Sequence, residues 1–319
     1  MSAIRTIAVI GTGTIGASWA ALFLGHGHDV IAHDPRPGSA DDLRMTVARL
    51  LPDARPRVPV AQGALSFAAS AEEAAGRADL IQENAPERPD IKADLIARLE
   101  AAMPAHCLIA SSTTALTHSV ITAKAKNPER IIVAHPFNPP HLVPLVELVG
   151  KSPDSPAIKR AYAFYRALGR EPVVLKKEAV GHLANRLQAA LVREALYILQ
   201  EGIADIAEID KAVKFGPGLR WAFMGPFQTY HLAGGEAGIR HYMEHLLPSQ
   251  MQRWAALGTP VMDASFIAQV VSGVEAATGG RPVAEMAAER DHALKAIIAA
   301  LAGQGDGETS DQPGSSVSN

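Results

Sequence analysis

The chain has little cysteine and few aromatic residues. Of its 319 residues one is cysteine, Cys107, and 5% are aromatic. A lone cysteine excludes an internal disulfide framework, and such usage is typical of a reducing cytosol. Cys107 adjoins the apolar run Leu108–Ser111, so we interpret it as a small buried residue near a strand and not as a nucleophile.

Long apolar runs and an excess of one charge are also missing. No run of 18 apolar residues occurs, so we expect no membrane span, and the first residues lead into a strand-like segment without a cleavable signal. The formal net charge of −3 gives no electrostatic case for nucleic acid or an anionic membrane. We therefore expect a cytoplasmic protein with a small-molecule substrate. The patterns HExxH and paired CxxC do not occur, so we predict no metal site.

The composition and the order of the patterns predict two domains. Apolar residues make up 48% and charged residues 20%, which supports a large core. Strand-like and helical patterns alternate until residue 178, and after Val180 only helical patterns follow. We predict an α/β domain with a doubly wound, Rossmann-type parallel sheet over residues 1–178 and a smaller all-helical substrate and dimerisation domain over residues 179–303. The polar residues 304–319 should form a disordered tail.

A glycine motif follows the first apolar run, Ile4–Ile10, and precedes a helical run. The first glycine permits a tight turn, the second lets a pyrophosphate approach the backbone, and the third lets helix and strand pack closely. The helix N-terminus then offers free N–H groups to phosphates. The predicted dinucleotide-binding loop is Gly11-Thr12-Gly13-Thr14-Ile15-Gly16.

An acidic residue, Asp34, ends the second predicted strand. It lies at the distance from the glycines expected for an acid that binds the adenosine ribose diol. A carboxylate repels a 2′-phosphate, so Asp34 favours NAD over NADP. Arg36 is close enough to keep the phosphorylated cofactor open as an alternative.

A histidine and an acid flank a proline-rich turn in the segment 134–150, AHPFNPPHLVPLVELVG. Glu147 lies in an apolar run that reads as a buried strand, where an unpaired acid is costly. The turn can bring His135 back to it, and such a pair is a general base with an orienting anion. The alternative is a core histidine and an acid on a strand edge.

Several polar residues follow predicted strands. They are the glycine loop, Glu83, the run Ser111–Thr114 and His135. Ligands of doubly wound sheets bind at the carboxyl ends of strands. We therefore expect these residues to gather at one cleft.

Taken together, the motifs resemble the 3-hydroxyacyl-CoA dehydrogenase superfamily. The resemblance rests on their order: GTGTIG, Asp34, ENAPER, SSTT, HPFNPP with VPLVELV, and GHLANRL at the start of the helical domain. It implies that His135 is the catalytic base and Glu147 its partner. It also implies that Thr114, in place of the more usual serine, and Asn185 hold the substrate oxygen.

The same resemblance implies further cofactor contacts. Glu87, Lys92 and Asn138 match family positions near the nicotinamide and the rest of the cofactor. His182 stands where phenylalanine is common in the family.

A closer resemblance is to the bacterial L-carnitine dehydrogenases. It rests on Phe215–Met243 and on the segment IAHDPRPG. L-gulonate 3-dehydrogenases and λ-crystallins share only GLR and MGP of the first segment. Carnitine bears a trimethylammonium group, which needs an aromatic or apolar cage. The residues that can supply the cage are Trp221, Phe223, Phe227 and Tyr230; core packing of a helix explains each of them equally well.

These observations predict NAD-dependent oxidation of a small 3-hydroxy acid, with L-carnitine as the best candidate. The alternatives are a 3-hydroxyacyl-CoA dehydrogenase, an L-gulonate 3-dehydrogenase, and a crystallin-like NAD-binding structural protein. We also expect a homodimer, because Leu191, Leu196, Ile198 and Leu199 on one long helix cannot all face a single neighbour.

Overall fold

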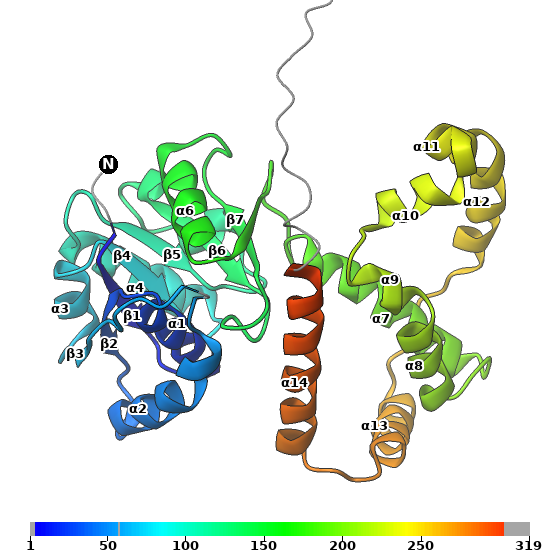
Figure 1. Cartoon of the computed structure of the whole chain (residues 1–319), viewed down its shortest axis with the longest axis horizontal. Helices are drawn as coiled ribbons and strands as arrows, with labels where there is room; N and C mark the ends of the chain where they lie inside the picture. The colour runs from blue at the N-terminus through cyan, green and yellow to red at the C-terminus, as the bar shows by residue number, and fades with distance from the viewer. Residues whose placement is uncertain (1–3, 57, 303–319) are drawn as a thin grey trace, which may run out of the picture. The chain divides into compact units, whose positions relative to one another are not determined.

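A computed structural model describes residues 4–56 and 58–302 of the chain. The chain divides into two compact units, the first ending at Leu187 and the second beginning at Gln188 (Figure 1). The predicted disordered tail, residues 304–319, lies outside the described residues.

The first unit is built on an eight-stranded sheet with the strand order β3-β2-β1-β4-β5-β6-β7-β8. Neighbouring strands β1 and β4 mark the point where the winding reverses, which is where such sheets bind ligands. The strands are β1 (Thr6–Ile10), β2 (Asp29–His33), β3 (Leu65–Phe67), β4 (Leu80–Glu83), β5 (Leu108–Ser111), β6 (Ile131–Pro136), β7 (Leu145–Val149) and β8 (Glu171–Val174).

The predicted doubly wound sheet is confirmed, but it is not parallel throughout. Strands β1 to β6 pair in parallel, β7 runs antiparallel to β6, and β8 is parallel to β7. The segment 137–144 is too short to hold a crossover helix, so the chain reverses directly into β7. This reversal places Glu147 opposite His135.

Helices cover both faces of this sheet. Residues of α1, α2 and α6 belong to the core on one face, and residues of α3, α4 and α5 to the core on the other. The helices of this unit are α1 (Thr14–Gly25), α2 (Ser39–Leu50), η1 (Leu51–Asp53), α3 (Ala71–Gly76), α4 (Pro89–Ala102), α5 (His118–Ile121), η2 (Pro128–Arg130) and α6 (Pro156–Ala167).

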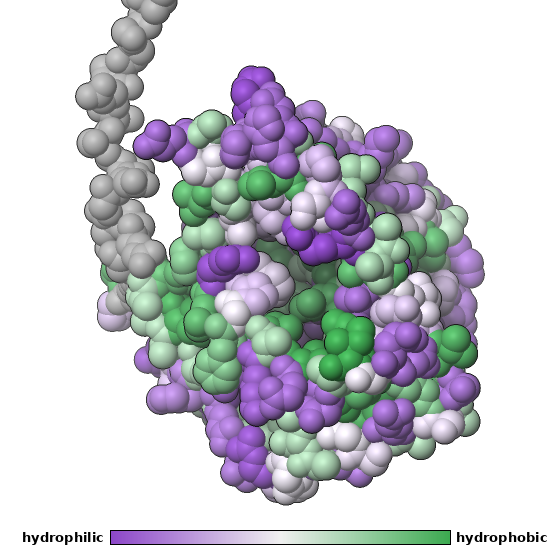
Figure 2. Space-filling model, turned by 90° about the vertical axis from the view of Figure 1, so that its right-hand side faces the viewer, coloured by the Kyte–Doolittle hydropathy of each residue, from purple (hydrophilic) through white to green (hydrophobic). Residues whose placement is uncertain are grey.

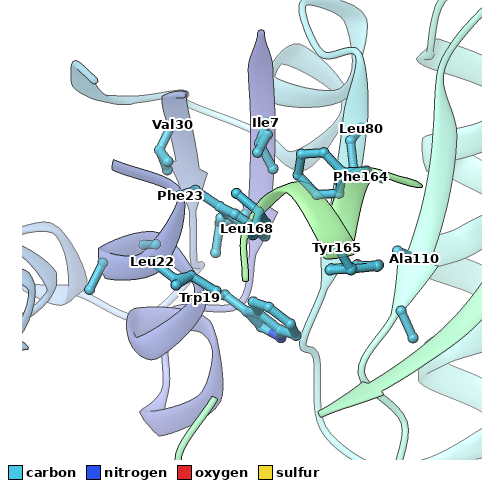
Figure 3. Packing of buried hydrophobic residues seen from close by; sticks show 14 of the residues in the cluster. Ile7, Trp19, Leu22, Phe23, Val30, Leu80, Ala110, Phe164, Tyr165 and Leu168 are labelled. Carbon is cyan, nitrogen blue, oxygen red and sulfur yellow. The ribbon is translucent and has the colours of Figure 1, made fainter. Parts of the chain in front are cut away.

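The few aromatic residues of this unit are concentrated where α1 and α6 meet the sheet (Figure 3). Trp19 stacks on Phe23 with ring centroids 5.4 Å apart and lies 5.5 Å from Tyr165. All three rings are fully or almost fully buried. This packing fixes α1, and with it the glycine loop at its start, against the sheet.

The second unit is helical over its described residues, 188–302, as predicted. Its loop 257–263 is fixed to α7 by two hydrogen bonds of 2.8 and 2.9 Å between Gln200 and Val261, and by one of 3.1 Å from Gly258 N to Glu194. The helices are α7 (Ala184–Gln200), which begins in the first unit, α8 (Ile206–Phe215), α9 (Pro217–Trp221), α10 (Pro226–Ala233), η3 (Gly235–Ala237), α11 (Gly238–His241), η4 (Tyr242–Leu246), α12 (Leu247–Ala256), α13 (Ala264–Thr278) and α14 (Val283–Ala302).

Across the described ranges, none of the helices combines the length and the apolar character that crossing a membrane requires.

Candidate active site

The histidine and the acid of the proline-rich segment form a buried pair. His135 on β6 and Glu147 on β7 are opposite each other in the antiparallel ladder, and His135 Nδ1 lies 2.8 Å from Glu147 Oε2. An ionised carboxylate only accepts, so Nδ1 carries the proton and donates it. Nε2 is then the ring nitrogen that can accept a proton from a substrate.

The second oxygen of Glu147 is bound by the turn that begins α7. Leu183 N donates to Oε1 at 2.7 Å and Ala184 N at 3.0 Å. The residue before them, His182, has a φ of 50°, in the left-handed region that non-glycine residues rarely adopt. That turn directs both amides at the carboxylate, so the acid anchors the start of α7 to the first unit.

These contacts keep Glu147 charged. Burial alone would raise its pKa, but the hydrogen bonds from His135, Ala184 N and Leu183 N outweigh burial and hold the pKa below its ordinary value. Glu147 is therefore an anion beside His135, as an orienting partner must be.

A second imidazole packs against the base. The rings of His182 and His135 lie 4.9 Å apart, and His182 Nε2 donates to the carbonyl of Thr113 at 3.1 Å. Burial lowers the pKa of His182, and the neighbouring His135 lowers it further, so His182 is neutral at pH 7. The His182 ring therefore adds a hydrogen bond to the loop that carries Thr114.

The glycine loop has the features that a dinucleotide needs. Gly11 has a φ of +86°, a Cβ on Gly16 would lie 1.9 Å from Gly11 O, and a Cβ on Gly13 would meet open space. Helix α1 has no side-chain cap, and its first backbone hydrogen bond runs from Ala17 N to Gly13 O. The N–H groups of Thr14 and Ile15, in the first turn of α1, are thus available to bind phosphates.

A cavity of about 690 Å³ extends from this loop along the ends of β1, β2 and β4. Asp34 lies in its wall and accepts hydrogen bonds from Thr12 N at 2.8 Å, Thr12 Oγ1 at 3.2 Å and Arg36 N at 3.0 Å. A carboxylate offers about four acceptor positions, so Asp34 retains capacity for a ribose hydroxyl. Arg36 pairs with Asp42 at 2.7 Å. The lining therefore fits an adenosine with a free ribose diol.

Two further predicted cofactor residues, Lys92 and Glu87, lie close together in the first unit. Lys92 is 1% exposed and pairs with Glu83 at 2.9 Å, while Glu87 lies 3.6 Å from the same ammonium. Glu87 also accepts hydrogen bonds from the loop that contains Thr114, whose own side chain is exposed. Ser111 Oγ donates to Glu83 at 2.5 Å, and both residues are fully buried, so these two lie together but do not line the cavity. The expectation that they gather at one cleft with the glycine loop, Thr114 and His135 stays a prediction.

The two asparagines occupy different elements. Asn138 follows β6 and precedes a cis peptide bond to Pro139, and Asn185 lies half-buried in the first turn of α7. The loop with Asn138 is fastened to α1, because Ser18 Oγ lies 2.8 Å from His141 Nδ1 and accepts from His141 N at 2.9 Å. Neither contact of this Ser–His pair was predicted, since 123 residues separate the partners.

Asn84 is a site residue that the sequence interpretation missed. It lines the cavity and accepts a hydrogen bond of 2.7 Å from Ser112 Oγ. Ser112 in turn accepts from Trp19 Nε1 at 3.1 Å and from Gln82 Nε2 at 2.9 Å. The position of Asn84 directly after β4, between Glu83 and Glu87, is the signal that could have revealed it.

The four aromatic residues of the proposed cage belong to the second unit. Trp221 ends α9, Phe223 follows it, and Phe227 and Tyr230 lie on α10. Trp221, Phe223 and Phe227 are 45%, 56% and 79% exposed, so core packing does not explain them. Tyr230 differs from them in that its ring packs against another ring of its own unit, that of Tyr242, with centroids 4.6 Å apart.

The dinucleotide-binding fold and the buried histidine–carboxylate pair define an NAD-dependent dehydrogenase that acts on a CH–OH group. Family models agree: the NAD-binding domain of 3-hydroxyacyl-CoA dehydrogenase matches residues 6–179, and the C-terminal domain matches residues 181–265. The chain belongs to the 3-hydroxyacyl-CoA dehydrogenase family.

Individual relatives extend the similarity over most of the chain. An L-carnitine dehydrogenase of Pseudomonas aeruginosa is 46% identical, over 93% of this chain and 94% of that protein. One of Streptomyces griseus is 44% identical, over 93% and 90%. Among solved structures, a 5-formyl-3-hydroxy-2-methylpyridine 4-carboxylic acid 5-dehydrogenase, an NAD⁺-dependent dismutase, is 27% identical with a TM-score of 0.79, over 94% of this chain and 99% of that one.

Proposed function

We propose that this chain oxidises the 3-hydroxyl group of a small 3-hydroxy acid, with L-carnitine as the substrate and 3-dehydrocarnitine as the product. The buried His135–Glu147 pair carries the chemical part of the proposal. The identity of 40–46% to L-carnitine dehydrogenases supports the choice of substrate.

His135 is the general base in this proposal. Neutral imidazole accepts the hydroxyl proton on Nε2, while Glu147 holds the ring through Nδ1 and stabilises the cation that forms. Bound NAD would accept the hydride that leaves the carbon bearing this hydroxyl group. Because Glu147 is already charged and hydrogen-bonded on both oxygens, the pair needs no rearrangement when the proton arrives.

Thr114 and Asn185 have the second role. They donate hydrogen bonds to the substrate oxygen as it becomes a carbonyl. Support comes from their local setting: the Thr114 loop is fixed by Glu87, and Asn185 lies in the turn that is bound to Glu147. Glu87 and Asn138 belong to the nicotinamide end of the cofactor, and the glycine loop and Asp34 to its adenosine end.

The cage for a trimethylammonium group is assigned to Trp221, Phe223 and Tyr230, with Phe227 as a further candidate. Such a cation neither donates nor accepts conventional hydrogen bonds, so aromatic faces are its natural partners. The exposure of Trp221 and Phe223 supports the assignment, because rings that do not fill the core of their own unit remain free to contact a ligand.

The substrate is tested by measuring NADH absorbance with purified enzyme, NAD and a panel of L-carnitine, 3-hydroxybutyrate, L-gulonate and 3-hydroxybutyryl-CoA. The proposal expects the highest kcat/KM with L-carnitine. A clear preference for the thioester or for gulonate would overturn the substrate, while the base would remain His135.

The cage is tested by Trp221→Ala. Loss of a cation–π contact of about 1.4 kcal/mol raises the KM for L-carnitine roughly tenfold. The KM for 3-hydroxybutyrate should change little, because that acid has no cation. Equal losses with both substrates would show a packing defect and remove Trp221 from the cage.

We further propose that the enzyme is a cytoplasmic homodimer whose interface lies in the helical unit. Over residues 188–302 many large apolar side chains are exposed, including Leu191 at 38%, Val192 at 47% and Trp254 at 54%. Hydrophobic side chains gather on the face shown in Figure 2. A second copy of the chain is the commonest way to cover such a surface.

A further inference from the structure

Lys92, in the first half of α4, is a buried cation that is hydrogen-bonded to two neighbouring residues, Glu83 and Ala85. Its ammonium donates to Glu83 Oε1 at 2.9 Å, to Glu83 Oε2 at 3.1 Å and to the carbonyl of Ala85 at 2.9 Å. An ammonium has three donors and no acceptor. These contacts use its hydrogen-bonding capacity, and the residue is 1% exposed.

Glu83, at the end of β4, connects this cation to the neighbouring strand. Its carboxylate also accepts from Ala85 N at 2.6 Å and from Ser111 Oγ, at the end of β5, at 2.5 Å. Removing one partner of a buried ion pair is strongly destabilising, because it leaves an uncompensated charge. The Glu83–Lys92 pair thus joins β4, β5 and α4 beneath the cleft.

Glu87 extends the network to the loop that presents Thr114. Its Oε1 accepts from Thr113 Oγ1 at 2.6 Å, from Thr114 N at 2.9 Å and from Ala115 N at 2.8 Å. Its Oε2 lies 3.6 Å from the ammonium of Lys92. One cation therefore faces two carboxylates, one bound to β5 and the other to the loop.

The charge of Glu87 depends on its hydrogen bonds to the loop and on Lys92. Burial alone would raise its pKa, but the hydrogen bonds from Thr113 and Ala115 and the charge of Lys92 bring the pKa below its ordinary value. An ionised Glu87 accepts the loop amides more strongly than a neutral one would. Removing Lys92 should therefore loosen the loop.

We propose that Lys92 is a positioning residue that acts through Glu83 and Glu87 to hold the loop 113–116, and so the hydroxyl of Thr114, in place. This role is separate from the direct cofactor contact expected from the family resemblance, and it rests on the bonds of Lys92 to Glu83 and of Glu87 to the loop. The catalytic consequence rests on the proposed function, in which Thr114 binds the substrate oxygen.

The test compares Lys92→Met with the double variant Glu83→Gln/Lys92→Met, which leaves no unpaired charge at position 83 if the single variant does not fold. Lys124→Met is the matched control, since it removes an exposed lysine that pairs with Asp94 of α4, the helix that carries Lys92. Three quantities are measured: deuterium uptake by the peptide containing residues 113–116, kcat, and the Kd for NAD.

In the folded Lys92 variants, uptake at 113–116 should rise and kcat should fall roughly 10- to 100-fold, the loss typical of a misplaced catalytic group. Lys124→Met should behave as wild type. Unchanged uptake at 113–116 in the folded Lys92 variants would overturn the proposal, and a raised Kd for NAD beside unchanged uptake would make Lys92 a cofactor ligand only. If wild-type enzyme oxidises no 3-hydroxy acid, the proposed function fails, while uptake still decides whether Lys92 holds the loop.

Discussion

Individual side chains at this site are held by groups on other elements, and Asp34 shows what this means for the cofactor. Its carboxylate is bound by the backbone of Thr12 and Arg36, while the guanidinium of Arg36 pairs with Asp42. Burial would raise the pKa of Asp34, but these hydrogen bonds lower it, so the acid is charged and repels a 2′-phosphate.

We predict that Asp34→Ala weakens NAD binding by about 10- to 100-fold, the worth of a hydrogen bond to a charged group of about 1.5–3 kcal/mol. The preference for NAD over NADP should narrow at the same time. Fluorescence titration with both reduced cofactors measures this, with the exposed Asp41→Ala as control. Equal use of the two cofactors by wild-type enzyme would contradict the assigned role.

Among the elements, the antiparallel pair β6–β7 and the start of α7 meet at one acid. The apolar run around Glu147 and the glycine motif before α1 could be predicted from sequence, because both patterns are local. The direction of β7 could not, since it depends on how the eight residues 137–144 turn. Neither could β3, whose three residues carry no clear period.

The same limit applies to the site. His135 and Glu147 were predicted as partners because the acid would be costly to bury alone, and the contact is present. The cofactor contact of Lys92 stays a prediction, and its ion pair with Glu83, nine positions earlier on another element, was not foreseen. A buried ion pair of this kind becomes visible only when the strand and the helix are placed together.

We predict that Glu147→Gln lowers the free energy of unfolding by about 1–3 kcal/mol at pH 7, because buried donors lose a charged acceptor. The folded pKa of Glu147 is depressed, so its contribution is complete above the ordinary value of 4.5 and is lost as pH falls through the folded pKa. Urea unfolding at pH 7 and at steps below 4.5 should show the two proteins converging in acid. A difference that does not change with pH would contradict this, and the exposed Glu129→Gln is the control.

At the scale of the whole molecule, the two units differ in how well they bury their apolar residues. The first unit has two extensive cores, whereas helices α7, α8, α12 and α14 have no fully buried residue. Such helices gain stability only when another surface covers them.

Light scattering at micromolar concentration should therefore give twice the 33.7 kDa of one chain. Leu191→Glu, on α7, should shift the mass toward that of the monomer, while Val58→Glu, at a 76% exposed position of the first unit, should not. A monomer mass for the wild-type protein would contradict the proposed dimer.

His135, oriented by Glu147, is assigned as the base of an NAD-dependent oxidation. The deciding measurement is the rate of NADH formation from L-carnitine at saturating NAD, for wild type and His135→Gln. We expect kcat to fall on the order of 100- to 10,000-fold, with a Kd for NAD close to that of wild type. A His135→Gln enzyme that turns over at a rate near wild type would contradict it.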